Sequence, residues 1–318
     1  MKKLLILLVI PFFSLSQQNP PTAQDTLNIN QFQTLVGPAA FMWDLSSAVT
    51  EVPLGSGLST IFSHEFLIGG INEEGELKIA AQIYRQNGND FWAGPLNIDN
   101  ATIAADECAK WDKHFKINRL VVEEYHARFG VDPTYVIPES ILDWPTHGDE
   151  SLGQDPFLAP FYDINDNGIY EPYSGDYPDY NVTGNNDDAA LFGDQTLFWI
   201  FNDKGNIHSE TGADPLGLEI HAQAFGFTSD NEVNDMTFYN YKIINRSTLP
   251  LNDTYFGQWV DADLGYYLDD YVGCDVNLGL GFCYNGDAED EGANGYGFNP
   301  PAIGVDFFQG PLADPLDG

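Results

Sequence analysis

The sequence predicts a mainly β protein, a β-sandwich-like domain with one helical insertion and calcium-binding loops. Short apolar runs of strand length alternate with turns rich in Gly, Asn and Asp along most of the chain. Hydrophobic residues make up 43% and aromatic residues 14% of the chain, enough for a folded core despite a net charge of −36. Only residues 101–129 place apolar side chains at helical spacing.

The chain begins with the pattern of a secretory signal peptide over residues 1–16. Lys2 and Lys3 precede an apolar run, and a small-x-small cleavage site follows it. The run is too short to span a bilayer, and no later stretch is long enough. We therefore expect a secreted or cell-surface protein without membrane insertion. Residues 17–36 are expected to form a flexible linker, and residues 37–318 a β-rich domain truncated at its C-terminal end.

The charge of the chain excludes two classes of partner. The sequence holds 12 Lys and Arg against 48 Asp and Glu. A protein of this sign repels nucleic acid and anionic membranes, so we expect neither as a partner. Binding divalent cations is the simplest way to relieve the repulsion among so many carboxylates.

The expected elements follow in chain order. Residues 62–70 and 77–84 form a hairpin of two strands. Residues 100–129 form one helix, or two helices broken near Asn118, that cap an edge of the sheet. Further strands are expected at residues 193–202, 218–224, 237–245 and 255–260. Several short strands separated by turns are typical of a β-sandwich.

A calcium loop is predicted where side-chain oxygens alternate before a glycine. Asp163, Asn165 and Asn167 precede Gly168, and the Ile169 carbonyl takes the place of a backbone ligand. Calcium takes about six to eight oxygen ligands, which alternate residues of a tight loop supply together. The alternative is an Asx-rich surface turn without metal, since Asp, Asn and Gly also favour turns.

The distal end of the loop departs from an EF-hand. Ser174 stands at the twelfth position, where an EF-hand has a bidentate Glu, and Pro172 opposes a following helix. A loop between strands therefore fits better. The missing carboxylate is expected from Glu171, Asp176 or a more remote acid, and Asp176 is favoured because Gly175 lets the chain fold back.

A second group of acids follows the strand over residues 255–260. Asp261 and Asp263 leave its end on one side, and Asp269 and Asp270 can fold back to complete an oxygen cage for calcium. The alternative is an acidic rim exposed to solvent. The later run over residues 287–291 lacks ordered spacing and is expected to be a solvated loop.

The cysteines suggest one bridge. Cys274 and Cys283 are expected to form a disulfide, which export would permit, and the alternative is two buried thiols. Cys108 is expected in the core.

No catalytic motif stands out. The sequence lacks H-E-x-x-H, G-x-S-x-G, a P-loop and a dinucleotide fingerprint. Glu219 and His221 share a strand face and would need His208 to bind zinc.

We therefore expect a calcium-stabilised, non-enzymatic module with an adhesive or structural role. The alternative is a secreted hydrolase or glycan-binding module that uses aromatic loops around Trp92 and Trp144, with a surface glycan or another cell-surface protein as partner.

Twelve blocks of the chain together resemble a known group of proteins. They are residues 59–62, 80–85, 90–96, 111–113, 144–145, 163–178, 198–203, 241–247, 259–265, 270–275, 284–286 and 300–301. They resemble the N-terminal region of large uncharacterised secreted proteins of Bacteroidetes-type bacteria, which commonly end in a type IX secretion C-terminal sorting domain.

That resemblance runs from about Gly55 to the last residue. It implies export across the outer membrane to give a surface-attached or released product, and it brings no activity. Residues 311–318 are loop-like and carry no sorting domain. We therefore expect the chain to be a fragment of a longer protein.

Overall fold

The computed structural model describes residues 19–37, 39, 41–42, 48–82, 88–184 and 186–310. Strands make up 34% and helices 10% of the structure, so the predicted β class is confirmed. The predicted signal peptide, residues 1–16, lies outside the described residues. Among the helices of the described residues, none has the length and apolar character needed to cross a membrane.

The first antiparallel sheet is built around one long strand, β5 (Ser59–Ile71). Along one side of β5 runs β14 (Asn252–Ala262), although the two strands are far apart in sequence. Along its other side lie the short strands β4 (Thr50–Glu51), β3 (Phe41–Met42) and β6 (Leu77–Ala80). The sheet continues from β4 to β2 (Gln33–Val36) and β1 (Asp25–Leu27).

The second sheet has the order β13–β12–β11–β7. It is formed by β13 (Phe238–Asn245), β12 (Leu218–Gly226), β11 (Gln195–Asn202) and β7 (Trp92–Ala93). A fifth strand, β8 (Phe115–Asn118), pairs with the other half of β11.

The two sheets pack face to face around one apolar core. Phe66 of β5 meets Phe201 of β11 edge to face, with ring centroids 6.0 Å apart. Ile220 of β12 and Trp199 of β11 belong to the same core, and both are at most 2% exposed. Alternate residues of each strand point inward, so the period-2 pattern of the sequence produces this layer.

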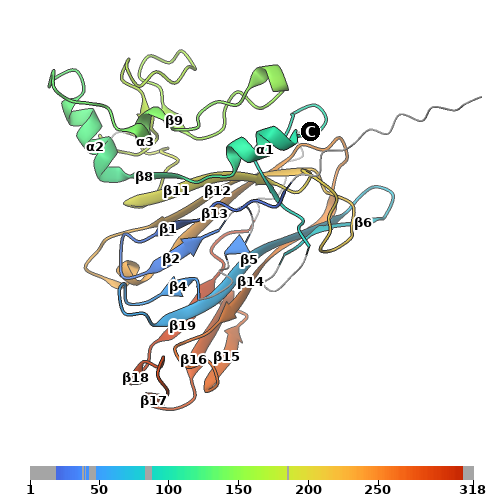
Figure 1. Cartoon of the computed structure of the whole chain (residues 1–318), viewed down its shortest axis with the longest axis vertical. Coiled ribbons are helices and arrows are strands. Elements are labelled where there is room, and N and C mark those ends of the chain that lie inside the picture. Colours follow the sequence, from blue (N-terminus) through green and yellow to red (C-terminus); the bar gives the residue numbers. More distant parts are fainter. Residues whose placement is uncertain are drawn as a thin grey trace, which may run out of the picture.

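A third layer covers the outer face of the second sheet (Figure 1). It contains α1 (Ala105–Trp111), α2 (Arg119–Arg128), α3 (Glu139–Leu142), η1 (Glu150–Leu152) and the strand pair β9 (Phe161–Tyr162) and β10 (Tyr177–Pro178). Phe198 and Ile200 of β11 share a second apolar cluster with Tyr125 of α2. The second sheet is therefore buried on both faces.

The helical insertion differs from the expected stripe. Two helices form, and β8 lies between them, so the stripe from Ala104 to Phe115 is not one helix. The first helix ends at Trp111, and the carboxylate of the next residue, Asp112, accepts hydrogen bonds from the backbone N–H groups of Thr22 and Ala23. The chain then extends to pair with β11. Val122 and Tyr125 pack against a face of the sheet, so the prediction of an edge cap is wrong.

The prediction of a flexible linker over residues 17–36 is also wrong for the part that the structure describes. Residues 25–27 and 33–36 are strands of the first sheet. Leu27 and Val36 are at most 1% exposed and belong to the main core. The polar composition of this segment predicted a linker, but the sheet buries polar Thr34 as well as Leu27 and Val36.

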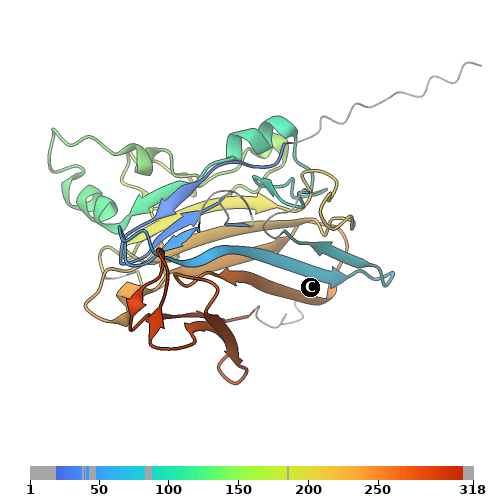
Figure 2. The same ribbon diagram turned by 60° about the horizontal axis from the view of Figure 1, so that its bottom comes forward.

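The C-terminal part forms two small sheets at the end of the molecule opposite the helices (Figures 1 and 2). The larger is a third sheet of β15 (Asp270–Asp275), β16 (Leu280–Asn285) and β19 (Ala302–Asp306). The smaller pairs β17 (Glu289–Asp290) with β18 (Gly297–Phe298). The helical turn η2 (Glu232–Asp235) precedes β13.

Candidate metal-binding loop

Residues 163–176 form a loop whose two ends are held together by the β9–β10 pair. Tyr162 lies opposite Tyr177, and their rings stack with centroids 5.0 Å apart and planes 14° apart. The ladder fixes the distance between the loop ends. The predicted calcium loop is therefore closed by strands, as expected for a loop outside an EF-hand.

The first half of the loop is a tight turn built by side-chain acceptors. Asp163 accepts hydrogen bonds from the N–H of Asn165 (3.1 Å) and of Gly168 (2.6 Å). Asn167 accepts from the N–H of Ile169 and donates its amide to Glu171 Oε2, at 2.8 and 2.9 Å. Gly168 has φ +75°, which a residue with a Cβ adopts only at a cost, so this glycine is required by the turn.

The second half of the loop folds back through Gly175, whose φ is +120°. Asp176 is fully buried, and its two carboxylate oxygens accept hydrogen bonds from the N–H groups of Ile164 (3.0 Å) and Glu171 (2.7 Å). Asp176 folds back to the start of the loop, as Gly175 was expected to allow, and its role as a metal ligand stays a prediction. Its carboxylate joins the two halves of the loop through their backbone.

Two tyrosines attach the loop to the third layer. The Tyr125 hydroxyl donates to the Pro172 carbonyl, and the Tyr170 hydroxyl donates to the Ile141 carbonyl, both at 2.7 Å. Burial raises the pKa of both hydroxyls, so they remain protonated donors. The loop is therefore fixed at its ends and at two points along its length.

The carboxylates of the loop have no cationic partner among the described residues. Within the described part of the chain, no ion pair involves Asp163, Asp166, Glu171 or Asp176. No three His, Cys, Asp or Glu side chains of the described residues gather as a metal-binding group. The loop offers two kinds of oxygen ligand for a metal ion. The carboxylates of Asp163 and Glu171 are charged, and the oxygens of Asn165, Asn167 and the Ile169 carbonyl are neutral. Calcium accepts both kinds of oxygen.

The second predicted group assembles only in part. Asp270 accepts a hydrogen bond from the Leu264 N–H at 2.9 Å, and Asp269 contacts the Asn285 amide at 3.3 Å. Asp261 instead lies in β14 opposite Ser63, and the structure shows no interaction between it and Asp269 or Asp270 within the described residues.

Two acids missed by the sequence reasoning complete this acidic cluster. The Glu291 backbone N–H is 3.4 Å from Asp269 Oδ2, and buried Asp290 accepts from the Tyr266 N–H at 3.0 Å. Residues 287–291 were expected to be solvated loop because their spacing shows no order. The hairpin of β17 and β18 brings them back toward Asp269 and Asp270, and no local pattern signals that return.

The acidic cluster holds carboxylates that repel one another. Burial raises the pKa of Asp270, and the charges of Asp269 and Asp290 raise it further. A hydrogen bond to Asp269 raises the pKa of Glu291, and burial adds to that shift. Among the described residues, Asp269 Oδ1 and Asp270 Oδ1 are buried atoms without a hydrogen-bond partner. A cation would relieve the repulsion at this point.

The predicted disulfide is wrong in this structure. Cys274 lies opposite Gly281 and Cys283 lies opposite Val272, so the two cysteines are diagonal neighbours, and both are free thiols. Diagonal neighbours in an antiparallel pair are about 7–8 Å apart, too far for a disulfide without backbone movement. Burial, with the nearby Asp270 carboxylate, raises the pKa of Cys283 to about 11.

The predicted aromatic ligand platform is also contradicted. Trp92 and Trp144 are only 2% and 4% exposed. Trp92 stacks on His208 with ring centroids 6.0 Å apart, and the Trp144 indole donates to the Pro160 carbonyl at 2.9 Å. Both rings pack onto the sheet, so neither presents a face to a sugar.

The three residues considered for zinc binding, Glu219, His221 and His208, do not come together. Glu219 and His221 contact each other at 2.8 Å on β12, and Arg246 binds the same Glu219 oxygen at 2.9 Å. His208 has other neighbours, since its Nδ1 lies 2.9 Å from the Ile79 carbonyl and its Nε2 contacts the Asp203 carbonyl. These side chains are tied into separate buried networks.

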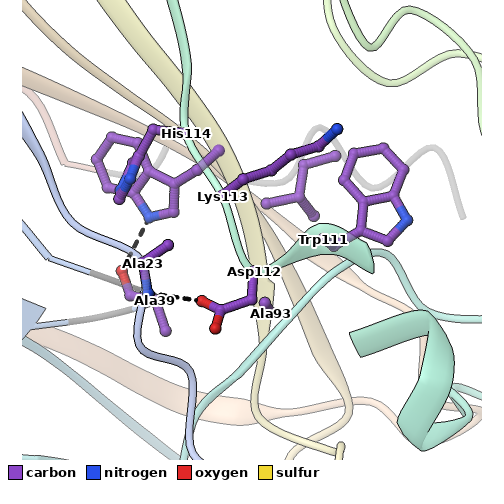
Figure 3. Close-up of a pocket in the computed structure, with 9 residues that line it drawn as sticks. Ala23, Ala39, Ala93, Trp111, Asp112, Lys113 and His114 are labelled. Atoms are coloured by element: carbon purple, nitrogen blue, oxygen red, sulfur yellow. Dashed lines mark hydrogen bonds between the residues drawn. The ribbon is translucent and has the colours of Figure 1, made fainter. Parts of the chain in front are cut away.

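One small cavity and one larger surface depression lie away from the predicted site residues. One beside Trp111 and His114 has a volume of about 10 Å³, room for about one water. Two hydrogen bonds lie among its lining residues: the Asp112 carboxylate accepts from the Ala23 N–H (Figure 3), and the Trp199 indole donates to the Ala39 carbonyl. A surface depression of about 540 Å³ lies among residues 103–105, 204–207 and 212–215.

The strongest candidate is therefore the loop over residues 163–176, with the acidic cluster of the C-terminal part second. No family model, no curated protein and no solved structure matches the chain, so the function rests on its own residues.

Proposed function

We propose that this chain is a calcium-stabilised, non-enzymatic β-rich module of a secreted or cell-surface protein, with an adhesive or structural role. The observation that supports this is the loop over residues 163–176. It combines alternating oxygen donors, a glycine turn and a rigid β9–β10 frame, and no cation of the described chain pairs with its carboxylates. Secretion is supported by the N-terminal pattern and by the resemblance to type IX-secreted proteins.

The loop residues have two proposed roles, binding calcium and positioning the ligands. Asp163, Asn165, Asn167 and Glu171 would hold calcium with side-chain oxygens, together with the Ile169 carbonyl. Asp176 already binds the Ile164 and Glu171 backbone and would position these donors. The cation would neutralise the negative charge of the loop. Because it would bind only the native loop, its binding free energy would add to the stability of the folded state.

A second calcium ion is proposed at the acidic cluster. Asp269 and Asp270 supply buried oxygens there, and Asp263 lies close enough to raise the pKa of Cys283 together with Asp270. Asp290 and Glu291 extend the donor set. Asp261 remains a predicted ligand of this ion.

The melting temperature of the full chain in EDTA and in excess calcium tests the proposal. At about one hundred times the dissociation constant, one bound ion stabilises the native state by about 2.7 kcal/mol. We expect calcium to raise the melting temperature by several degrees. Equal melting temperatures in the two buffers would contradict the proposal.

A matched pair of variants assigns the effect to the loop. Asp163→Asn removes a ligand charge and a turn acceptor, so the calcium-induced rise should shrink. Asp166→Asn removes the same charge from an exposed residue between the ligand positions and should keep the rise. An equal loss in both variants would point to net charge instead of a site.

The alternative of a hydrolase or glycan-binding module finds no support at its predicted residues, because Trp92 and Trp144 are buried.

A further inference from the structure

The third sheet exposes a row of aromatic rings on one face. Tyr271 lies opposite Tyr284, and Gly273 lies opposite Phe282, so these side chains share a face of the sheet. Tyr271 and Tyr284 are 58% and 42% exposed. The Tyr271 and Phe282 rings each lie 6.0 Å from the Tyr284 ring, centroid to centroid. We call Tyr271, Phe282 and Tyr284 the aromatic face.

Glycines beneath the rings make this surface flat. A Cβ on Gly273 would lie 2.6 Å from the Phe282 ring, and a Cβ on Gly286 would lie 2.4 Å from the Tyr271 ring. The rings therefore cover bare backbone instead of standing upright between neighbouring side chains. One side of the Tyr271 and Phe282 rings rests on these glycines, and the other side is left for contact.

On the opposite face of the same sheet, β16 and β19 turn side chains toward the rest of the protein, whereas Val272 of β15 is 81% exposed. Cys283, which lies between Phe282 and Tyr284 in β16, is 2% exposed, and Ile303 and Val305 of β19 are half-buried. The alternation of β16 thus places Cys283 inside and its aromatic neighbours outside. The Phe282 and Tyr284 rings therefore lie on the outer face because of the side to which β16 turns them.

The charge around the aromatic face has one sign. Residues 247–318 contain thirteen Asp and Glu residues and no Lys, Arg or His. Asp275 and Asp306 both lie opposite Leu280, so they flank the end of the aromatic row on the same face. Within the described residues, neither carboxylate takes part in an ion pair.

We propose that the aromatic face is a docking surface for an arginine-rich, extended segment of a partner protein. A guanidinium group stacks on aromatic rings and pairs with carboxylates, and this surface offers both within one sheet face. Neutral glycans would use the rings but would leave Asp275 and Asp306 without a role. Acidic partners are repelled. The proposal is independent of calcium at the loop over residues 163–176.

The test uses the full chain with saturating calcium and a synthetic peptide of alternating Arg and Gly. A peptide with citrulline in place of Arg keeps the shape and removes the charge. We expect titration calorimetry to show binding of the Arg peptide, weakened by sodium chloride, and no binding of the citrulline peptide. Equal binding of the two peptides, or binding of a neutral polysaccharide that displaces the Arg peptide without any effect of salt, would overturn the proposal.

Variants separate the surface from the general negative charge. Tyr271→Leu and Tyr284→Leu keep apolar volume and remove a ring, and each should weaken binding about fivefold. The double variant Asp275→Asn with Asp306→Asn should weaken it similarly. Tyr255→Leu and Asp253→Asn are controls, since both residues are exposed and lie in β14, outside the third sheet. Equal losses in the controls and in the surface variants would contradict the assignment. Unchanged melting temperatures verify that each variant is folded.

Discussion

Asp163 and Asp176 have different structural roles in the loop over residues 163–176. Asp163 forms the turn and is half-buried, whereas Asp176 is fully buried and binds only backbone N–H groups within the described residues. The local alternation of Asp163, Asn165 and Asn167 made the turn predictable from sequence, and Gly175 made the return of Asp176 predictable. The roles of Asp290 and Glu291 were not predictable, because a distant hairpin carries them to Asp269.

His64 illustrates how burial alone fixes a charge state. It lies in β5, and its Nδ1 accepts a hydrogen bond from the Gln258 amide at 3.1 Å. The Tyr239 ring packs against it edge to face at 5.0 Å. Burial lowers the pKa of His64 from 6.5 to about 4, so the native state holds this ring neutral.

We predict that His64 makes the protein less stable in acid. The unfolded chain binds the proton below pH 6.5 and the native state only below about pH 4, so the contribution is complete above pH 6.5 and is lost as the pH falls to about 4. The loss is about 3 kcal/mol over this range. Urea unfolding at several pH values should show a shallower decline for His64→Gln than for the original chain. The exposed His126, changed to Gln, is the control, and an equal slope in all three proteins would contradict the prediction.

At the scale of elements, β11 belongs to two cores at once. Trp199 and Phe201 point into the space between the sheets, and Phe198 and Ile200 point toward the third layer. Aromatic residues alternate onto both faces of this strand, which is typical of a strand buried on both sides. What covers each face was not predictable, because the partners come from segments far along the chain.

Replacing one aromatic residue on each face should separate the two cores. Phe198→Ala and Phe201→Ala each leave a cavity and should cost about 3–5 kcal/mol in unfolding free energy. Phe198 packs at 5.7 Å from Trp144, so its loss should also loosen the third layer and the loop over residues 163–176. Hydrogen exchange should show faster exchange in residues 119–180 for Phe198→Ala than for Phe201→Ala. The same exchange pattern in both variants would mean that the layers open together.

At the scale of the whole molecule, the charge of −36 opposes compaction. We predict that raising sodium chloride from about 0.01 M to about 1 M raises the melting temperature in EDTA, because the Debye length falls from about 30 Å to about 3 Å. The rise should be smaller in calcium, since bound ions already neutralise part of the charge. Potassium chloride should act equally. A melting temperature that falls with salt in EDTA would contradict this account.

The fold class was predictable from the sequence because strand and turn signals are local. Leu27 and Val36 escaped prediction, since their segment reads as polar until the sheet that buries them is known. The register of β15 and β16 likewise decides that Cys274 and Cys283 remain apart. Features that depend on local propensity could be predicted, and features that depend on the pairing of distant segments could not.

The pairing of β5 with β14 has a consequence for the order of folding. Residues that pair between these two strands are as far as 201 positions apart, as for Ile61 and Ala262. A chain that emerges from a ribosome or a translocation pore with its N-terminus first cannot complete its first sheet until residue 262 has emerged. Closing such a long loop slows folding. Until that moment the free side of β5 needs protection from neighbouring chains, which makes this strand the point where a holding chaperone would be most useful.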